Sequence, residues 1–104
     1  MNRVDGKVAV VTGGTQGLGK AIAMNLAKMG AKGIVTLGRN EKRGEEVAMS
    51  VNHETSCETY FFKTELSDVN NCREAIAFTL EKFSQIDILV NAAGLTDRGN
   101  ILET

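Results

Sequence analysis

The chain has 104 residues, enough for one small domain. Its formal net charge of −1 argues against nucleic acid or an anionic membrane surface as a partner, because both favour a basic excess. The polar segment 1–7 is unlike a signal peptide, and no apolar stretch is long enough to cross a membrane, so we expect a cytoplasmic protein.

The two cysteines and the single histidine are residue types that often act in catalysis or metal binding, but we predict no such role for them here. Cys57 and Cys72 give no disulfide framework, and we expect two buried or half-buried thiols in a reducing compartment. His53 stands alone among polar residues, with no second ligand spaced to help it. We therefore expect His53 at the surface and predict no metal site.

The first elements are a strand and a helix on either side of a glycine-rich loop. The apolar run Val8–Val11 is typical of a strand buried on both faces of a parallel sheet. A helical period follows over residues 17–29, and Gly30 suits the position after a helix end. The apolar face predicted for this helix consists of Leu18, Ile22, Leu26 and Met29.

Two further strands and a helix follow. Gly33–Gly38 is predicted to be a strand, and Asn40 to cap a helix with a weak apolar face at Val47 and Val51. Gly44 counts against that helix, at a cost of about 1 kcal/mol relative to alanine. The aromatic-rich segment Glu58–Lys63 fits a third strand.

The last predicted elements are an amphipathic helix and an apolar strand. Ser67 suits a helix N-cap, and Ile86–Val90 has the composition of an interior strand. The apolar stripe of the helix consists of Val69, Cys72, Ile76, Leu80 and Phe83.

The alternation of strands and helices predicts an α/β fold with a parallel sheet. We expect residues 7–94 to form a Rossmann-type parallel sheet with helices on both faces and only the first four strands present. The expected spatial order is third, second, first, fourth.

The most informative segment is the glycine loop 12–20, which joins a buried strand to a helix. Free N–H groups and the positive end of the helix dipole meet at such a junction, so a phosphate or pyrophosphate is its natural ligand. Glycine at Gly13, Gly17 and Gly19 would allow close approach of the backbone. The loop nearly matches a P-loop, but Ala21 stands where a Mg²⁺-binding hydroxyl is needed. A P-loop-like NTPase therefore remains an alternative.

The spacing Thr12-Gly13-x-x-x-Gly17-x-Gly19 resembles the cofactor motif of the short-chain dehydrogenase/reductase family. The segment 87–94, ending in Asn-Ala-Ala-Gly, is similar to that family's Asn-Asn-Ala-Gly segment on the fourth strand, with Ala92 in place of the second asparagine. Glu65-Leu66 stands where the family has an acid, usually aspartate, before an apolar residue that meets the adenine ring. The resemblance covers residues 4 to about 96 and implies a hydride-transferring oxidoreductase acting on an alcohol or carbonyl.

The resemblance also shows what these residues do not contain. The family's catalytic serine, tyrosine and lysine lie after the fourth strand, and the residue four positions after Tyr60 is Thr64 rather than lysine. We therefore assign no catalytic residue. We expect residues 1–104 to be the NADP-binding part of a single Rossmann-fold domain, inactive alone, from a longer protein that is a homo-oligomer. A non-catalytic dinucleotide-binding module remains a second alternative.

The end of the second strand indicates NADP in preference to NAD. An NAD site usually has a carboxylate about twenty residues beyond the glycine loop, and Gly38 stands at that position. Arg39 follows and is suited to a 2′-phosphate, with Thr15 as a possible hydroxyl donor. The predicted cofactor-binding residues are Gly13, Thr15, Gln16, Gly17, Leu18, Gly19, Arg39, Asn40, Glu65, Leu66, Asn91, Ala92, Ala93 and Gly94.

Overall fold

The computed structural model describes residues 4–13, 17–65 and 69–91 of the chain. Strands and helices alternate along them, as the sequence predicts. The elements are β1 (Val8–Thr12), α1 (Gly17–Lys28), β2 (Gly33–Gly38), α2 (Glu41–Glu54), β3 (Glu58–Lys63), α3 (Val69–Phe83) and β4 (Ile88–Asn91). The largest shift in a boundary is at the fourth strand, which begins at Ile88 rather than Ile86. The predicted cap at Ser67 lies outside the described residues.

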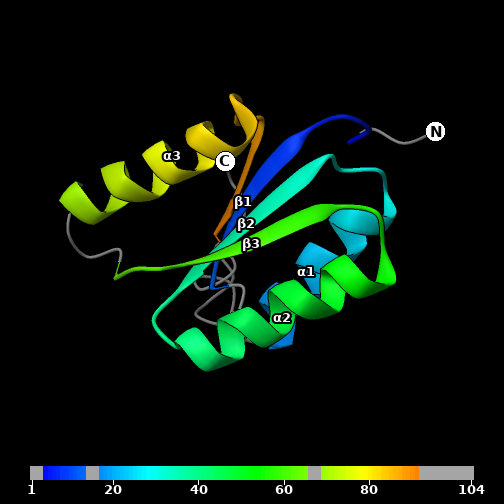
Figure 1. The fold of residues 1–104 in the computed structure, drawn as a ribbon, viewed down its shortest axis with the longest axis horizontal. Helices are drawn as coiled ribbons and strands as arrows, with labels where there is room; N and C mark the ends of the chain where they lie inside the picture. Colours follow the sequence, from blue (N-terminus) through cyan, green and yellow to red (C-terminus); the bar gives the residue numbers. More distant parts are fainter. Residues whose placement is uncertain (1–3, 14–16, 66–68, 92–104) are drawn as a thin grey trace.

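The strands form one parallel sheet in the order β3-β2-β1-β4 (Figure 1), which confirms the predicted order. The chain moves outward from β1 to β3 and then crosses to the other side of β1. Thr12, at the end of β1, is in register with Leu37 of β2 and Asn91 of β4. The carboxyl ends of the strands therefore meet at one edge, at the point where the strand order reverses.

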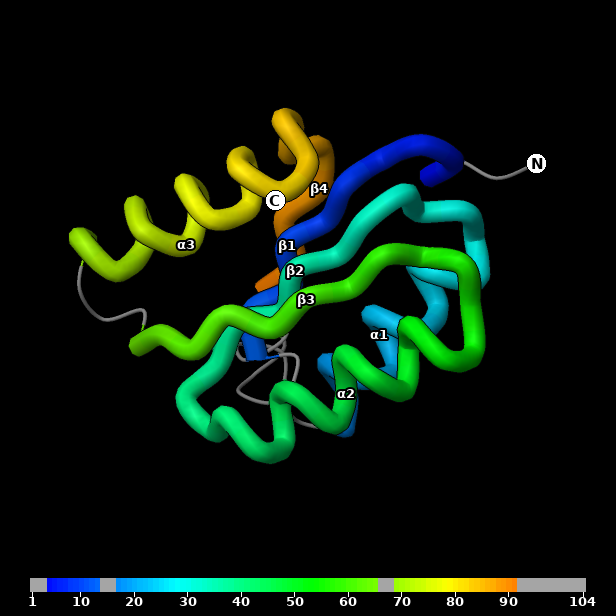
Figure 2. The backbone as a smooth tube through the Cα atoms, viewed as in Figure 1, coloured from blue at the N-terminus to red at the C-terminus, as the bar shows by residue number. Residues whose placement is uncertain are grey.

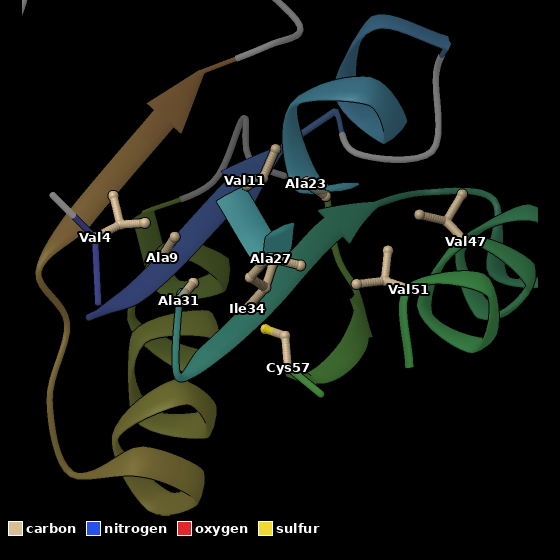
Figure 3. Packing of buried hydrophobic residues seen from close by; sticks show 10 residues of the cluster. All are labelled: Val4, Ala9, Val11, Ala23, Ala27, Ala31, Ile34, Val47, Val51 and Cys57. Atoms are coloured by element: carbon tan, nitrogen blue, oxygen red, sulfur yellow. The ribbon is translucent and has the colours of Figure 1, made fainter. Parts of the chain in front are cut away.

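The sheet lies between two helical layers. Helices α1 and α2 cover one face and α3 lies over the other (Figures 1 and 2). Alternate residues of β1 serve the two faces, because Ala9 and Val11 belong to one apolar cluster and Val8 and Val10 to the other. Figure 3 shows the first cluster, in which Ile34 and Val51 are fully buried. All five residues of β1 are buried, as expected for a strand covered on both faces.

The buried face of α1 differs from the predicted stripe. Leu18 and Met29 are exposed, whereas the buried residues are Gly19, Ala23 and Ala27. Small residues four positions apart let the helix lie close to the sheet, so the longer side chains pack beside the contact line instead of on it. The predicted cap is confirmed: Gly30 has φ +100°, and hydrogen bonds from Gly30 and Ala31 close the end of the helix.

Helix α2 forms despite its internal glycine. The Asn40 side chain accepts a hydrogen bond from the Arg43 N–H, which confirms the predicted cap. Gly44 is buried, and a Cβ there would lie 2.2 Å from the ring of Phe61 on β3. The glycine thus gives up helix propensity to admit an aromatic ring between α2 and the sheet.

Helix α3 and strand β4 are less covered than the sequence predicts. Of the predicted stripe, Phe83 is buried, whereas Val69, Ile76 and Leu80 are exposed. The other buried residues of α3 are Ala75 and Thr79. Leu89 of β4 is 71% exposed, and within the described part of the chain β4 pairs only with β1. Among the described residues β4 therefore stands at the edge of the sheet, although its apolar composition is that of an interior strand. Figure 2 shows β4 at the side of the sheet opposite β3.

Candidate functional site

A cavity of about 570 Å³ opens where the strand ends meet. Its polar lining comes from residues at or just beyond the ends of the strands. Its apolar lining comes from the face of the sheet beneath α3, from the residues leading into β4 and from α3 itself. The lining residues are Val10, Thr12, Gly13, Leu37, Gly38, Arg39, Thr64, Glu65, Cys72, Ala75, Ile76, Ile86, Leu89 and Asn91.

Gly13 turns the chain out of β1 at the mouth of this cavity. It has φ +74°, in the left-handed region that glycine adopts at little cost. Its N–H donates to the carbonyl of Leu37 at 3.0 Å, so it extends the pairing with β2 before the chain leaves the sheet. A side chain at this position would be strained whatever the space around it.

The first turn of α1 is suited to an anion. It has no acidic residue, and a Cβ built at Gly17 would meet nothing within 4 Å. The first N–H groups of a helix have no partner within it and carry the positive end of the dipole. Leu18 is exposed on this turn and Gly19 is buried beneath it. Phosphate oxygens could therefore approach the helix end without meeting a side chain at Gly17.

Arg39 follows β2, and its side chain is 77% exposed. Its Nη1 lies 3.7 Å from Oε2 of Glu65, which follows β3 and is 51% exposed. The main chain beside Glu65 is held on two sides: the Thr64 N–H donates to the carbonyl of Gly38 at 2.8 Å, and Asn71 Nδ2 of α3 donates to the carbonyl of Glu65 at 2.7 Å. The two charged groups thus face each other across the ends of neighbouring strands.

Thr12 opens the glycine motif but is absent from the predicted cofactor-binding residues, and the structure makes it a positioning residue. It is 8% exposed, and its hydroxyl donates to Oδ1 of Asn91 at 2.9 Å. The contact fixes the side chain at the end of β4 relative to the end of β1. A hydroxyl residue before the glycine loop and an amide at the end of the neighbouring strand were the available signal. Only the register between the strands shows that they meet.

The cavity brings together four of the predicted cofactor-binding residues, and others lie apart. Gly13, Arg39, Glu65 and Asn91 line the cavity. The helix residues Gly17, Leu18 and Gly19 stand in the first turn of α1, and the side chain of Asn40 caps α2. The predicted residues outside the described part of the chain are Thr15, Gln16, Leu66, Ala92, Ala93 and Gly94. The motif signalled neither Thr64 nor the apolar lining from α3.

Titratable side chains outside the cavity show no catalytic arrangement in the described residues. The Tyr60 hydroxyl donates to the carboxylate of Glu58, which raises the pKa of Tyr60, whereas a tyrosine acting as a base needs a lowered pKa. Burial raises the pKa of the Cys57 thiol. Cys57 is buried and Cys72 half-buried, as predicted, and His53 is exposed.

Neither a metal-binding cluster nor a membrane-spanning helix occurs among the described residues. No three His, Cys, Asp or Glu side chains lie close enough together to hold a metal ion. None of the helices in this part of the chain combines the length and the apolar character needed to span a membrane.

Comparison with known sequences gives one family. The model of the short chain dehydrogenase family matches residues 7–104. A 3beta-hydroxysteroid dehydrogenase of Mediterraneibacter gnavus is 36% identical over 103 residues, which cover 99% of this chain and 37% of that protein. Zerumbone synthase of Zingiber zerumbet is 37% identical over 95 residues, covering 90% of this chain and 34% of that protein.

Solved structures agree with this assignment. The L-sorbose reductase of Gluconobacter frateurii, complexed with NADPH and L-sorbose, matches all of this chain with a TM-score of 0.84 and 32% identity. The 3-ketoacyl-(acyl-carrier-protein) reductase of Brucella melitensis, complexed with NADH, matches 84% of it with a TM-score of 0.76 and 32% identity. The chain covers 40% and 34% of those two chains, so it spans well under half the length of its relatives.

Proposed function

This chain belongs to the short-chain dehydrogenase/reductase family, and from this premise we propose that it is the cofactor-binding part of an NADP-dependent oxidoreductase. The bound dinucleotide would supply or accept a hydride, with a small alcohol or carbonyl compound as the substrate. Residues 1–104 would bind and orient the cofactor within a single domain, and the catalytic groups would come from elsewhere in the intact protein. A cytoplasmic location and homo-oligomeric assembly stay predictions for that protein.

The observation that carries this proposal is the meeting of the strand ends around one cavity at the reversal of strand order. Gly13 allows close approach at the end of β1, Asn91 is fixed by Thr12, and Arg39 offers a cation at the end of β2. The cavity is of a size that small-molecule sites commonly have, about 300–1,000 Å³. Its mixture of apolar wall and polar rim suits a nucleotide with an apolar base and a charged backbone.

Arg39 supports NADP as the preferred cofactor. The end of β2 has no carboxylate, because Gly38 stands there, and Arg39 is the next residue. A planar guanidinium can give paired hydrogen bonds to a phosphate. The NADPH in the sorbose reductase and the NADH in the ketoacyl reductase are bound by proteins similar to this chain, so family membership leaves the choice of dinucleotide to such local groups.

The test is to measure binding of NADP and NAD to the complete protein and to Arg39→Ala. We expect tighter binding of NADP, and in the variant a loss of about ten- to a hundredfold for NADP alone, since a charge-assisted hydrogen bond contributes about 1.5–3 kcal/mol. Equal affinities in the unmodified protein, or equal losses in the variant, would show that Arg39 does not read the 2′-phosphate. Turnover with alcohols or carbonyls, measured on the same protein, separates an enzyme from a non-catalytic module.

The alternative of a P-loop NTPase has no observation in its favour. Ala21 lies exposed on α1 and has no hydroxyl for Mg²⁺, and the matching family model is that of the dehydrogenases. Binding of dinucleotide that is independent of Mg²⁺ would remove this alternative. Binding of a nucleoside triphosphate only with Mg²⁺ would restore it.

A further inference from the structure

We propose that Glu65 sets how strongly this site discriminates between dinucleotides with and without a 2′-phosphate, by acting as a competing anion for Arg39. The inference rests on the proposed function, because it assumes that a dinucleotide occupies the cavity. It goes beyond that function by giving a second residue, on a different strand end, a defined effect on the choice of cofactor.

The Glu65 carboxylate lies beside Arg39 at the cavity. Oε2 of Glu65 lies 3.7 Å from Nη1 of Arg39, within the range of an ion pair, and both residues line the cavity. The pair bridges the residues that follow β2 and β3, where the sheet itself is still paired by the bond from Thr64 to Gly38. Arg39 therefore has an anion beside it before any phosphate arrives.

The main chain of Glu65 is anchored by hydrogen bonds. Its carbonyl accepts a hydrogen bond from Asn71 in the first turns of α3, and the preceding residue is joined to β2. These hydrogen bonds hold the backbone of Glu65 in place. Only its side chain can rotate away, and that side chain is half exposed, so water can receive the carboxylate.

The Glu65 carboxylate and a 2′-phosphate would compete for the same cation. A 2′-phosphate that binds Arg39 must either displace the Glu65 carboxylate or share the guanidinium with it, and like charges in close proximity repel. A dinucleotide with a free 2′-hydroxyl meets neither cost. Glu65 therefore lowers the affinity for NADP relative to that for NAD. Arg39 without the Glu65 carboxylate would give a stronger preference for NADP than Arg39 and Glu65 give together.

The effect can be separated from other roles of Glu65. A contact between this carboxylate and the base or the ribose 3′-hydroxyl would be common to NAD and NADP, so it cancels in the ratio of their dissociation constants. Removing the charge with Glu65→Gln keeps the size of the side chain and its main-chain anchors. The ratio therefore reports only what happens at the 2′ position.

The experiment measures the dissociation constants of NADP and NAD for four forms of the complete protein: unmodified, Glu65→Gln, Arg39→Ala and the double variant. Glu65→Gln is expected to raise the preference for NADP about two- to fivefold, the range of coupling found for exposed ion pairs. In the Arg39→Ala background the same change is expected to alter the preference by a clearly smaller factor. Glu54→Gln, at the end of α2 near the opposite edge of the sheet, is the matched control for net charge and should leave the ratio unchanged.

Each result has a defined meaning. An unchanged or reduced preference in Glu65→Gln overturns the inference, since Glu65 would then be neutral or would hold Arg39 in place for the phosphate. An equal gain in both backgrounds also overturns it, because the carboxylate would act on the phosphate directly and not through Arg39. If the unmodified protein binds neither dinucleotide, the proposed function itself fails. If it binds NADP through Arg39 and only the Glu65 effect is missing, the proposed function stands and this inference falls.

Discussion

Two adjacent residues at the end of β1 shape the site through different contacts. Thr12 uses its side chain to hold Asn91 of β4, and Gly13 uses its main chain to extend the pairing with β2. One residue needs a hydroxyl and the other needs φ +74°. Because the two requirements differ, both residues are needed. Together Thr12 and Gly13 link the ends of β1, β2 and β4 at the point where the strand order reverses.

Gly17 offers the sharpest test of the glycine loop. We expect Gly17→Asp to abolish dinucleotide binding while the protein stays folded. A carboxylate about 4 Å from a phosphate costs about 4 kcal/mol at an effective dielectric constant of 20, or about a thousandfold in affinity. The fold should survive because a Cβ at this position meets nothing within 4 Å, and aspartate is favourable at a helix N-terminus. Dinucleotide titration and circular dichroism on the same variant measure both effects.

Gly33 supplies the contrasting control for that substitution. A Cβ there would lie 2.2 Å from the ring of Phe83, which α3 packs against β2, so Gly33→Ala should lower stability even though it adds only a methyl group. Unchanged cofactor affinity in a folded Gly17→Asp protein would show that the loop is only a turn. A Gly17→Asp protein that unfolds like Gly33→Ala would show that Gly17 serves packing.

At the scale of elements, the existence and order of the strands and helices follow from the sequence, whereas their buried faces do not. The change from continuous apolar runs to a helical period identified each element, and Asn40 and Gly30 marked a start and an end. Of the apolar stripes predicted for α1 and α3, only Phe83 is buried. Apolar spacing shows which face of a helix is hydrophobic, but not which neighbouring element covers it. In α1 the sheet selects Ala23 and Ala27, whose small size is the reason for the close contact.

The candidate site was predictable to a similar degree. Glycine spacing located Gly13 and the start of α1, and Arg39 followed from its place after β2. The pairing of Arg39 with Glu65 was not predictable, because it depends on two strand ends that are far apart in the sequence and adjacent in the sheet. From the sequence alone Gly44 counts only as a weakness of α2. The Phe61 ring that requires a glycine there belongs to β3, and only the fold brings the two residues together.

Asp87 joins the start of β4 to the start of β1, at the edge of the sheet opposite the site. The Val8 N–H donates to its Oδ2 at 2.9 Å and Gln85 Nε2 donates to the same oxygen at 2.7 Å. These hydrogen bonds, with the nearby charges of Lys7 and Lys32, lower the pKa of Asp87. A carboxylate bonded in this way stabilises the folded state only while it is ionised.

We therefore expect Asp87→Asn to lower the unfolding temperature at pH 7, by an amount that shrinks in acid. Because the folded pKa is depressed, the contribution is fully present above the unfolded pKa of about 3.9 and disappears as the pH falls through the folded value. Thermal unfolding of both proteins across this pH range measures the difference. Asp5→Asn, an exposed carboxylate in the turn before β1, is the control. A difference that does not depend on pH would mean that the charge of Asp87 is not what matters.

On the scale of the whole molecule, one side of the sheet is less complete than the other. Val69, Ile76 and Leu80 of α3 are exposed apolar side chains, and Leu89 of β4 is 71% exposed. Ile76 and Leu89 also line the cavity, so this apolar surface includes part of its wall. In the described part of the chain, β4 also lacks a strand on the side away from β1. Exposed apolar surface and an open strand edge both favour association with other polypeptides.

This surface leads to a prediction for residues 1–104 produced alone. A chain of this length buries only roughly two-thirds of the surface of its unfolded form, so it has little stability to spare. We expect it to self-associate through β4 and α3, and we expect Leu89→Lys to reduce the association, because a charged side chain on an edge strand opposes further pairing. Sedimentation velocity over a range of concentrations measures the effect.

Lys at an exposed site away from this surface is the necessary control, and Met49→Lys provides it, since Met49 is 67% exposed on α2. Both variants add one positive charge and remove one apolar side chain, but only Leu89→Lys alters the proposed contact. Self-association that falls in Leu89→Lys and persists in Met49→Lys places the contact on the β4 side of the sheet. A stable monomer of the unmodified residues 1–104 would contradict the prediction, because the exposed apolar surface would then be tolerated in water. Equal effects of the two lysine substitutions would also contradict it, because the contact would then not lie specifically on β4.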